Sequence, residues 1–256
     1  MTVVFALANQ KGGVGKTTTA INLGAYMALK GRRVLLVDID PQANATSGLC
    51  RERPQGGRDI YHVLIEGLPI EHVVRLTNRV GLDLVPSSPS LAGAEVELVD
   101  ARDREYRLKL ALATIKRHYD YVLIDCPPSL GFLTLNALAA SDGVIVPVQC
   151  EYLALEGLSH LVNTVDLVRR QVNSHLRLAG LVLTMFDPRT NLAHQVVQEV
   201  RTHFPTTFAA IIPRSVRLSE APSYGQSIFE YDPRSKGAQA YAALTDEVLE
   251  RSFAGG

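Results

Sequence analysis

The chain has 256 residues, of which 46% are hydrophobic and 20% charged, which is typical of a globular protein with a buried core and excludes a disordered chain. The 26 Lys and Arg residues balance 26 Asp and Glu residues, so no global positive field marks a nucleic-acid binder. Cys50, Cys126 and Cys150 are far apart and lack metal-ligand spacing. We therefore expect reduced, mostly buried thiols and no disulfide or metal framework.

The first residues are apolar but show no basic leader, and the segment soon meets Asn9 and Lys11. This pattern predicts neither a signal peptide nor a membrane span, and hence a soluble, cytoplasmic chain. No linker or change of composition divides the sequence. Residues 1–256 are therefore predicted to form a single domain.

Short, β-branched apolar runs alternate with stretches of helical spacing along the chain. The expected strands are 3–8, 34–37, 82–85, 121–124, 144–148, 181–184 and 208–212. Helical spacing is clear at 155–168, where apolar residues recur at i, i+3 and i+4. Strands that are apolar throughout are buried on both faces, which predicts a three-layer α/β domain with a mainly parallel, twisted sheet flanked by helices. In such folds ligands bind beyond the carboxyl ends of the strands.

A glycine-rich loop, QKGGVGKTT at 10–18, follows the first expected strand and precedes a helical run at 19–29. This is the context of a phosphate loop, in which glycines let the backbone approach the phosphates and the helix N-terminus adds positive potential. Lys16 is expected to bridge the β- and γ-phosphates of ATP, and Thr17 to place its hydroxyl on Mg²⁺. The residues expected to bind ATP or ADP in this loop are Lys11, Gly12, Gly13, Val14, Gly15, Lys16, Thr17 and Thr18.

The loop departs from the standard pattern at its start. A glycine is expected six residues before Lys16, but Gln10 stands there and a second lysine, Lys11, follows it. A cation at this position is too far round the loop to duplicate Lys16, so it either reaches a nucleotide held by a second subunit or is a solvated surface lysine. The run KGGVGKTT resembles the deviant Walker A motif of the ParA/MinD ATPase superfamily. The resemblance implies that Lys11 contacts the partner's nucleotide in an ATP-bound homodimer and is catalytic together with Lys16.

Two aspartates follow the second expected strand. Asp38 and Asp40 are two apart, so on an extended chain they point to the same side and can both face the phosphate loop. An Asp-Pro pair can also merely begin a turn, with Asp38 as a capping residue. The resemblance implies that Asp40 positions the attacking water near Mg²⁺ and is catalytic, with Asp38 in a supporting shell around the metal and Lys16.

The strand expected at 121–124 ends in Asp125, which is the form of a Walker B strand. Asp125 is then expected to hold Mg²⁺ through its waters. The predicted metal residues are Thr17, Asp38, Asp40 and Asp125. Iron–sulphur members of the superfamily use cysteines to bridge subunits, but Cys126 stands alone and is assigned no cofactor.

Later segments are similar to the chromosomal ParA (Soj) branch of the superfamily, and the similarity spans essentially the whole chain. They are EYLALEG at 151–157, IPR at 212–214, LSEAPSYG at 218–225 and YDPRSKG at 231–237. The resemblance implies an ATP-bound homodimer that binds double-stranded DNA without sequence preference at the nucleoid. It also implies a ParB-type partner that stimulates hydrolysis during chromosome or plasmid segregation.

The same resemblance places DNA contacts at Arg189 and Arg217 and the base pocket near Met185 and Pro213. Taken alone, each arginine is more readily a solvated surface charge than a DNA contact. Because the net charge of the chain is zero, pairing of two copies is expected to double the cations that face one duplex and to gate DNA affinity by nucleotide.

Two other interpretations share this loop. A MinD-like membrane ATPase ends in a basic amphipathic helix, whereas the last expected helix here carries Asp246, Glu247 and Glu250 against Arg251. Anionic lipid repels an acidic face, so no membrane partner is expected. A metabolic enzyme, such as a metal-delivery or cobyrinate-amidating relative, is expected to need extra ligands or a substrate-binding extension, and neither is seen.

Overall fold

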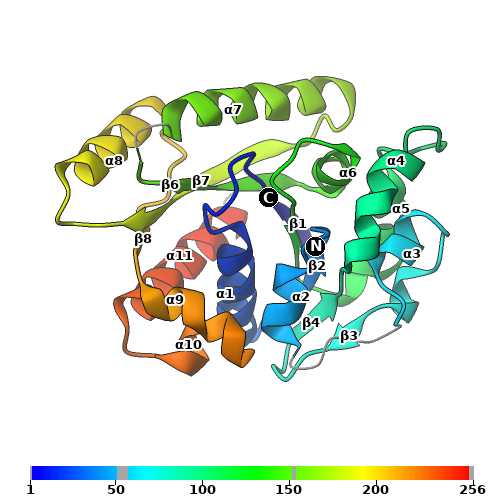
Figure 1. The fold of residues 1–256 in the computed structure, drawn as a ribbon, viewed down its shortest axis with the longest axis horizontal. Helices are drawn as coiled ribbons and strands as arrows, with labels where there is room; N and C mark the ends of the chain where they lie inside the picture. The colour runs from blue at the N-terminus through cyan, green and yellow to red at the C-terminus, as the bar shows by residue number, and fades with distance from the viewer. Residues whose placement is uncertain (1, 51–56, 152–153, 254–256) are drawn as a thin grey trace.

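The computed structural model describes residues 2–50, 57–151 and 154–253, which are built around a sheet of eight strands (Figure 1). The strands are β1 (Val3–Leu7), β2 (Val34–Asp38), β3 (Arg75–Leu76), β4 (Leu82–Val85), β5 (Tyr121–Asp125), β6 (Gly143–Gln149), β7 (Arg177–Phe186) and β8 (Ile211–Pro213). Their order in the sheet is β3-β4-β2-β5-β1-β6-β7-β8. Neighbouring strands are parallel, except that β3 and β4 are antiparallel. The mainly parallel sheet is confirmed.

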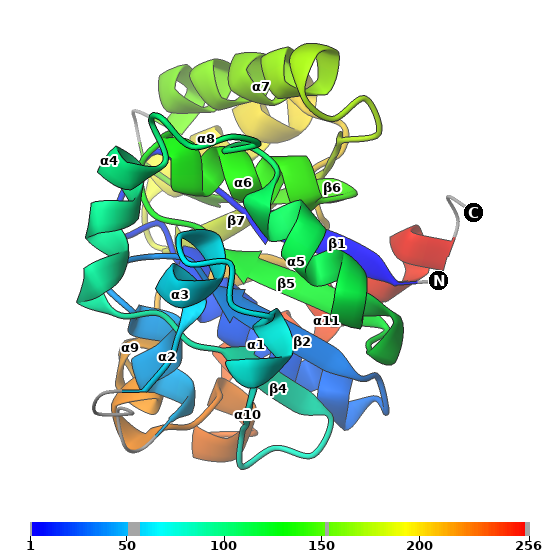
Figure 2. The ribbon, with the colours of Figure 1, turned by 90° about the vertical axis from the view of Figure 1, so that its right-hand side faces the viewer.

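Helices cover both faces of this sheet. They are α1 (Lys16–Leu29), α2 (Asn44–Leu49), α3 (Ile60–Leu64), α4 (Ala94–Glu97), α5 (Arg107–Ile115), α6 (Phe132–Ala140), α7 (Ala154–Gln171), α8 (Asn191–His203), α9 (Val216–Glu220), α10 (Ile228–Tyr231) and α11 (Lys236–Phe253). A short 3₁₀ turn, η4 (Ala221–Tyr224), joins α9 to the segment before α10. Figure 1 shows α7 and α8 on one side of the sheet and α1 and α11 on the other, and the turned view of Figure 2 shows the strands between these layers.

Each central strand contributes to two hydrophobic cores. In β1, Val4 and Ala6 belong to the core under α6 and α7, whereas Phe5 and Leu7 belong to the core under α1 and α11. Successive side chains of a strand point to opposite faces of the sheet, so burial on both faces requires an unbroken apolar run. This requirement explains why the strands are recognisable in the sequence.

The last expected strand, at 208–212, has the wrong bounds, because β8 begins only at Ile211. The side chain of Phe208 is buried, and the backbone N–H groups of the two residues after it each donate to the Glu247 carboxylate at 2.7 Å. Amides that are held by a side chain cannot join a strand ladder, so the strand starts later. The strand β3 was not expected, because two residues carry too little pattern to be recognised.

The last helix is held to the body of the protein by its charged residues. Asp246 pairs with Lys30 at 2.6 Å, and Arg251 donates to the carbonyl of Thr206 at 2.7 Å. Asp246 and Glu247, two of the three acidic residues expected on this helix, are therefore bonded within the chain itself. Within the described ranges, we find no helix with both the length and the apolar character needed to cross a bilayer.

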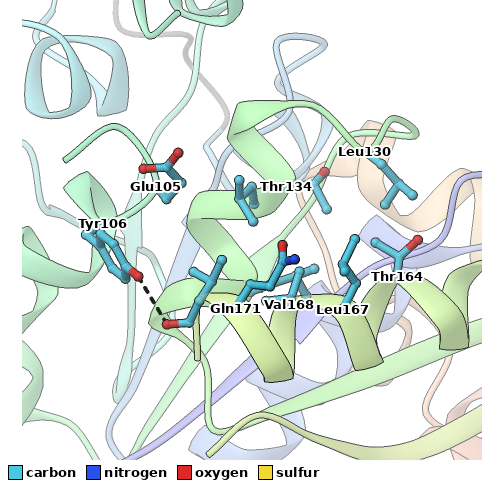
Figure 3. Close-up of a pocket in the computed structure, with 11 residues that line it drawn as sticks. Glu105, Tyr106, Leu130, Thr134, Thr164, Leu167, Val168 and Gln171 are labelled. Carbon is cyan, nitrogen blue, oxygen red and sulfur yellow. Dashed lines mark hydrogen bonds between the residues drawn. The ribbon is translucent and has the colours of Figure 1, made fainter. Parts of the chain in front are cut away.

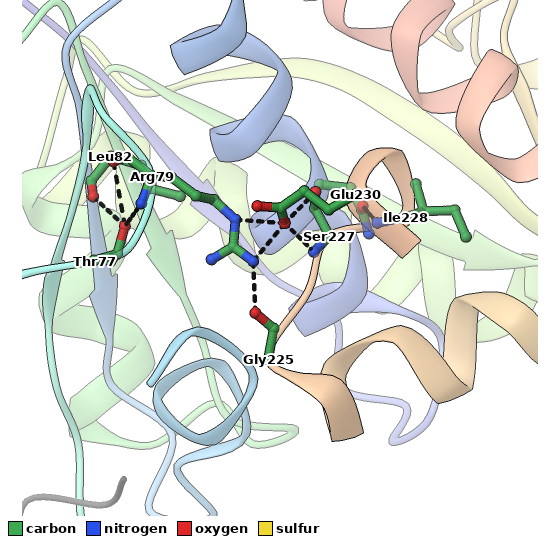
Figure 4. A network of polar contacts seen from close by, with 8 residues as sticks. Thr77, Arg79, Leu82, Gly225, Ser227, Ile228 and Glu230 are labelled. Atoms are coloured by element: carbon green, nitrogen blue, oxygen red, sulfur yellow. Dashed lines mark hydrogen bonds and ion pairs between the residues drawn. The ribbon is translucent and has the colours of Figure 1, made fainter. Parts of the chain in front are cut away.

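Arg79, in the β3–β4 loop, fastens the edge of the sheet to the C-terminal segment (Figure 4). Its Nε donates to the Glu230 carboxylate at 2.7 Å, and its Nη2 donates to the Gly225 carbonyl at 2.7 Å. Glu230 also accepts the backbone N–H of Ser227, closing a capping box at the start of α10. Only 8% of the Arg79 side chain is exposed, so this contact fixes the segment that follows α9.

Candidate nucleotide site

The glycine loop connects β1 to α1 at the carboxyl edge of the sheet. Gly13 and Gly15 have φ angles of 73° and 90°, in the left-handed region where a side chain is disfavoured. Within the described part of the chain, no side chain caps the N-terminus of α1. The first N–H groups of this helix are therefore available to an anion, as a phosphate site requires.

Lys16 lies inside this loop with 6% of its surface exposed. Its Nζ donates to the carbonyl of Lys11 at 3.4 Å. Burial lowers the pKa of Lys16, while the charge of Asp125, and to a smaller extent that of Asp40, acts in the opposite direction. The ammonium group therefore lies within electrostatic reach of both carboxylates.

Asp125 and Asp38 are neighbours in the sheet, because they face each other in the register of β5 and β2. Both are fully buried, and among the described residues neither oxygen of Asp125 has a hydrogen-bond partner of good geometry. Burial, and then the charge of Asp38, raise the pKa of Asp125 well above its usual value, while the Thr17 hydroxyl and the Lys16 ammonium oppose this rise. A buried carboxylate without a partner needs a cation, and Mg²⁺ fits this position.

Asp38 is satisfied by the chain itself. Its Oδ1 accepts the backbone N–H of Asp40 at 3.1 Å, and its Oδ2 accepts the N–H and the hydroxyl of Thr46 at 2.8 and 2.7 Å. Burial raises the pKa of Asp38 to about 6, although the hydrogen bonds from Thr46 act against the rise. These contacts suit a supporting position better than direct coordination of a metal.

Asp40 lies in the turn after β2 and is 5% exposed. Its Oδ1 accepts the backbone N–H of Gln42 at 2.9 Å, and its carbonyl accepts the hydroxyl of Ser87 at 2.8 Å. The turn includes Ala43 at a φ of 53°, a left-handed conformation that is uncommon for a residue with a side chain. Such residues concentrate at functional sites.

The four expected metal residues do not form a closed cage. Over the described ranges, no three His, Cys, Asp or Glu side chains converge closely enough to hold a metal ion by themselves. Mg²⁺ usually takes one or two carboxylates, keeps several waters and binds phosphate oxygens. The open arrangement of Asp125 and Thr17 is therefore suited to magnesium that arrives with a nucleotide.

A cavity of about 340 Å³ opens beside the phosphate loop. It is lined by Gly15, Thr18, Thr184, Met185, Ile212, Pro213, Arg214, Ser215, Val216, Leu218, Ser219 and Tyr241. The cavity thus brings together Met185 and Pro213, the two residues expected at the base pocket. Met185 has a φ of 53°, and the Thr184 hydroxyl before it donates to the Val14 carbonyl at 2.9 Å. This bond joins the end of β7 to the loop.

Two residues that support the loop were missed in the sequence. Thr184 is one, and Asn9 is the other: its Nδ2 donates to the Pro147 carbonyl at 2.7 Å, and its Oδ1 accepts the N–H of Lys11 at 3.0 Å. The available signal was a polar residue at the end of an apolar strand. Such a signal is common and does not by itself indicate which group the polar side chain will bond.

Lys11 lies at the surface, where its Nζ pairs with Glu151 at 3.2 Å. The two side chains are 44% and 50% exposed, so the pair contributes little to stability. Lys11 is therefore free to exchange this partner for another anion.

The two expected DNA-contacting arginines lie outside the phosphate loop. Arg189, 86% exposed, follows β7 and makes a two-point contact with Asp187, with N–O distances of 2.9 and 2.7 Å. Arg217, 60% exposed, lies on α9 after β8 and pairs with Asp232 at 2.5 Å. Because β7 and β8 are parallel neighbours, both arginines follow strands that end at the same edge of the sheet.

The cysteines are free thiols. Burial, and then the charge of Asp125, raise the pKa of Cys126, and burial raises the pKa of Cys150 to about 11. Both thiols are therefore neutral near pH 7. Cys50 is partly exposed.

A second cavity, of about 440 Å³, lies between α6 and α7 beside Tyr106 (Figure 3). Leu130, Leu167 and Val168 point towards it, and the Tyr106 hydroxyl donates to the Val172 carbonyl at 3.3 Å on its wall. None of the expected site residues lines this cavity.

A parallel sheet whose central strands bring a phosphate loop and two buried aspartates to one edge defines a phosphate-loop nucleotide-binding protein. A family model described as "AAA domain" matches residues 2–178. The chain is 55% identical over 246 residues to the sporulation initiation inhibitor protein Soj of Bacillus subtilis, covering 96% of this chain and 97% of that protein. It is 54% identical over 249 residues to the chromosome partitioning protein ParA of Myxococcus xanthus, covering 97% and 88%. The chain belongs to the Soj/ParA family of chromosome-partitioning proteins.

A solved structure described as cobyrinic acid a,c-diamide synthase from Mycobacterium smegmatis, with bound ATP analog and magnesium, is also similar. The TM-score is 0.88 at 39% identity, and the match covers 100% of this chain and 98% of that one. A cobyrinate-amidating relative was expected to need a substrate-binding extension. Because the match covers 98% of that chain, this expectation does not separate it from the present one. Sequence identity does favour the partitioning proteins, at 55% and 54%.

Proposed function

We propose that the protein, which is a Mg²⁺-dependent ATPase, works as a switch in chromosome or plasmid segregation. The observation that carries the proposal is the unpaired, buried carboxylate of Asp125 next to the phosphate loop, within reach of Lys16. Family membership and the ATP analog and magnesium of the similar solved structure support the same activity.

In this mechanism the loop N–H groups and Lys16 hold the phosphates, and the cavity at Met185 and Pro213 takes the base. Thr17 and Asp125 are the groups that would hold Mg²⁺, which neutralises charge on the phosphates when it is bound. Asp40 orients the attacking water. Hydrolysis of this kind depends on positioning and charge more than on covalent chemistry.

Lys11 reaches the nucleotide of a second copy, so the ATP-bound state is a homodimer. Its exposure and its weak pairing with Glu151 support this role. The dimer binds duplex DNA at the nucleoid without sequence preference, through Arg189 and Arg217, and a ParB-type partner stimulates hydrolysis. Both arginines are exposed, and each contacts a partly buried aspartate, which a phosphate group can replace as the partner of the guanidinium.

The enzymatic part is tested by turnover and nucleotide binding. Lys16→Ala is expected to lose ATP binding, Lys11→Ala to bind ATP without pairing, and Asp40→Ala to pair without hydrolysis. Lys30→Ala, which removes a surface lysine that pairs with Asp246, is the matched control and should behave as wild type. Unchanged turnover in Asp40→Ala would remove that residue from its role.

The DNA part is tested by retardation of a random-sequence duplex with no nucleotide, ADP and ATP. Retardation is expected with ATP and Mg²⁺ only, and Arg189→Glu should abolish it. Arg177→Glu, an exposed arginine at the opposite end of β7, is the matched control. Equal retardation with ADP would contradict a nucleotide-gated switch, and sedimentation with anionic liposomes would favour a membrane ATPase. Amidation of cobyrinic acid by the purified chain would favour a synthase.

A further inference from the structure

Two residues outside the expected site contact the turn that holds Asp40. Thr46 lies on α2, and Ser87 follows β4. The two are 2% and 5% exposed, so their hydroxyl groups are screened from solvent and must bond within the protein.

Thr46 acts on Asp40 through Asp38. The Thr46 hydroxyl and N–H donate to Asp38 Oδ2 at 2.7 and 2.8 Å, and Asp38 Oδ1 in turn accepts the N–H of Asp40 at 3.1 Å. One carboxylate therefore links the first turn of α2 to the peptide nitrogen of Asp40.

Ser87 closes the arrangement from the other side. Its N–H donates to the Thr46 hydroxyl oxygen at 2.9 Å, and its own hydroxyl donates to the Asp40 carbonyl at 2.8 Å. The Thr46 hydroxyl thus serves as donor and acceptor at once, and both peptide groups of Asp40 are held.

Because both of its peptide groups are bonded, the backbone of Asp40 is held in place, and this sets the direction in which its side chain leaves the turn. Neither hydroxyl lies in the phosphate loop or lines the cavity beside it. Loss of either hydroxyl should therefore leave ATP binding intact and disturb only the group that orients water.

We propose that Thr46 and Ser87 are positioning residues for ATP hydrolysis, which hold Asp40 in place through its two peptide groups. This inference rests on the proposed function, in which Asp40 orients the attacking water.

The test compares Thr46→Val, Thr46→Ser and Ser87→Ala with wild type in kcat and KM. Thr46→Val should lower kcat by about 10-fold or more with KM nearly unchanged, because misplacement of about 1 Å can cost 10²-fold in rate. Thr46→Ser keeps the hydroxyl and should restore most of the rate. Ser87→Ala retains its N–H and should lower kcat less than Thr46→Val. Thr245→Val removes a fully buried hydroxyl on α11, which donates to Tyr241, and should leave kcat unchanged.

Nucleotide binding and pairing separate positioning from a general loss of structure. Thr46→Val should bind ATP and pair in its presence as wild type does, because its hydroxyl does not line the cavity beside the phosphate loop. Loss of ATP binding, full activity of Thr46→Val, or failure of Thr46→Ser to restore the rate would overturn the inference. If Thr46→Val does not fold, wild-type kcat in Ser87→Ala overturns it. Absence of ATP turnover in wild type would instead refute the proposed function itself.

Discussion

Replacement of Asp125 by asparagine removes a buried charge while keeping the shape of the side chain. The carboxylate is fully buried and accepts no hydrogen bond of good geometry from the described residues, and asparagine keeps a side-chain oxygen for the nearby Thr17 hydroxyl. Burial and the neighbouring Asp38 raise its pKa, which means that its charged form destabilises the fold. The cost of an unsatisfied buried group is about 1–3 kcal/mol. We expect Asp125→Asn to raise the Tm of the metal-free protein by about 2–10 °C.

The stability gained by Asp125→Asn depends on pH in a defined direction. Because the pKa of Asp125 is higher in the folded state than its usual value of 3.8, the folded chain binds more protons between these two values. The free energy of unfolding of wild type therefore falls as pH rises through this window, by up to about 1.4 kcal/mol per pH unit. Asparagine does not titrate. The stability difference should thus be small near pH 4 and grow as the pH increases.

The assay is thermal unfolding in EDTA without nucleotide, from pH 4 to pH 8. Asp59→Asn is the matched control, because Asp59 is also buried but accepts the N–H of Tyr61 at 3.0 Å. This control variant should not have a higher Tm than wild type. Mg²⁺ with ATP should stabilise wild type and not Asp125→Asn, which should also lose hydrolysis. A variant that is less stable than wild type at pH 8 in EDTA would refute the reasoning, since it would mean that the charge is compensated.

Three further substitutions probe packing and buried charge. Gly180→Ala should cost about 1–3 kcal/mol in urea unfolding, because a Cβ there would clash with the Phe208 ring and lie 2.8 Å from the Thr206 carbonyl oxygen. Phe208→Ala should cost about 3–5 kcal/mol. The double variant Gly180→Ala/Phe208→Ala should cost less than the sum of the two single variants, because the new methyl group fills the space that the Phe208 ring vacates. Strict additivity of the two costs would contradict this. Arg79→Met should cost about 2–3 kcal/mol, below the full cost of a broken buried pair because Glu230 is 33% exposed; a variant as stable as wild type would show that the pair is dispensable.

The phosphate loop and the strands could be predicted because their signals are local. The apolar run at 3–8 and the glycine loop at 10–18 are adjacent in the chain, and the structure brings Asp38 and Asp125 to the edge where strand ends were expected. The roles of Arg189 and Arg217 in DNA binding, and of Lys11 in pairing, remain predictions.

The partners of Asp40 could not be predicted in the same way. Ser87 lies 47 residues away from it and 41 away from Thr46, and neither hydroxyl belongs to a motif. A buried serine or threonine has a sequence signal no different from that of any other polar residue beside an apolar run. Contacts of this kind depend on which loops meet in space.

The sequence by itself determined the phosphate loop, the alternation of strands and helices, and the aspartates at two strand ends, because each depends on neighbouring residues and on burial of both strand faces. Only the tertiary structure decided that β5 lies between β1 and β2, which sets Asp125 beside Asp38 and within reach of Lys16. The physical reason is that strands buried on both faces share one apolar pattern, so the pattern does not specify which strands are neighbours. Side-chain packing and hydrogen bonds between distant segments make that choice.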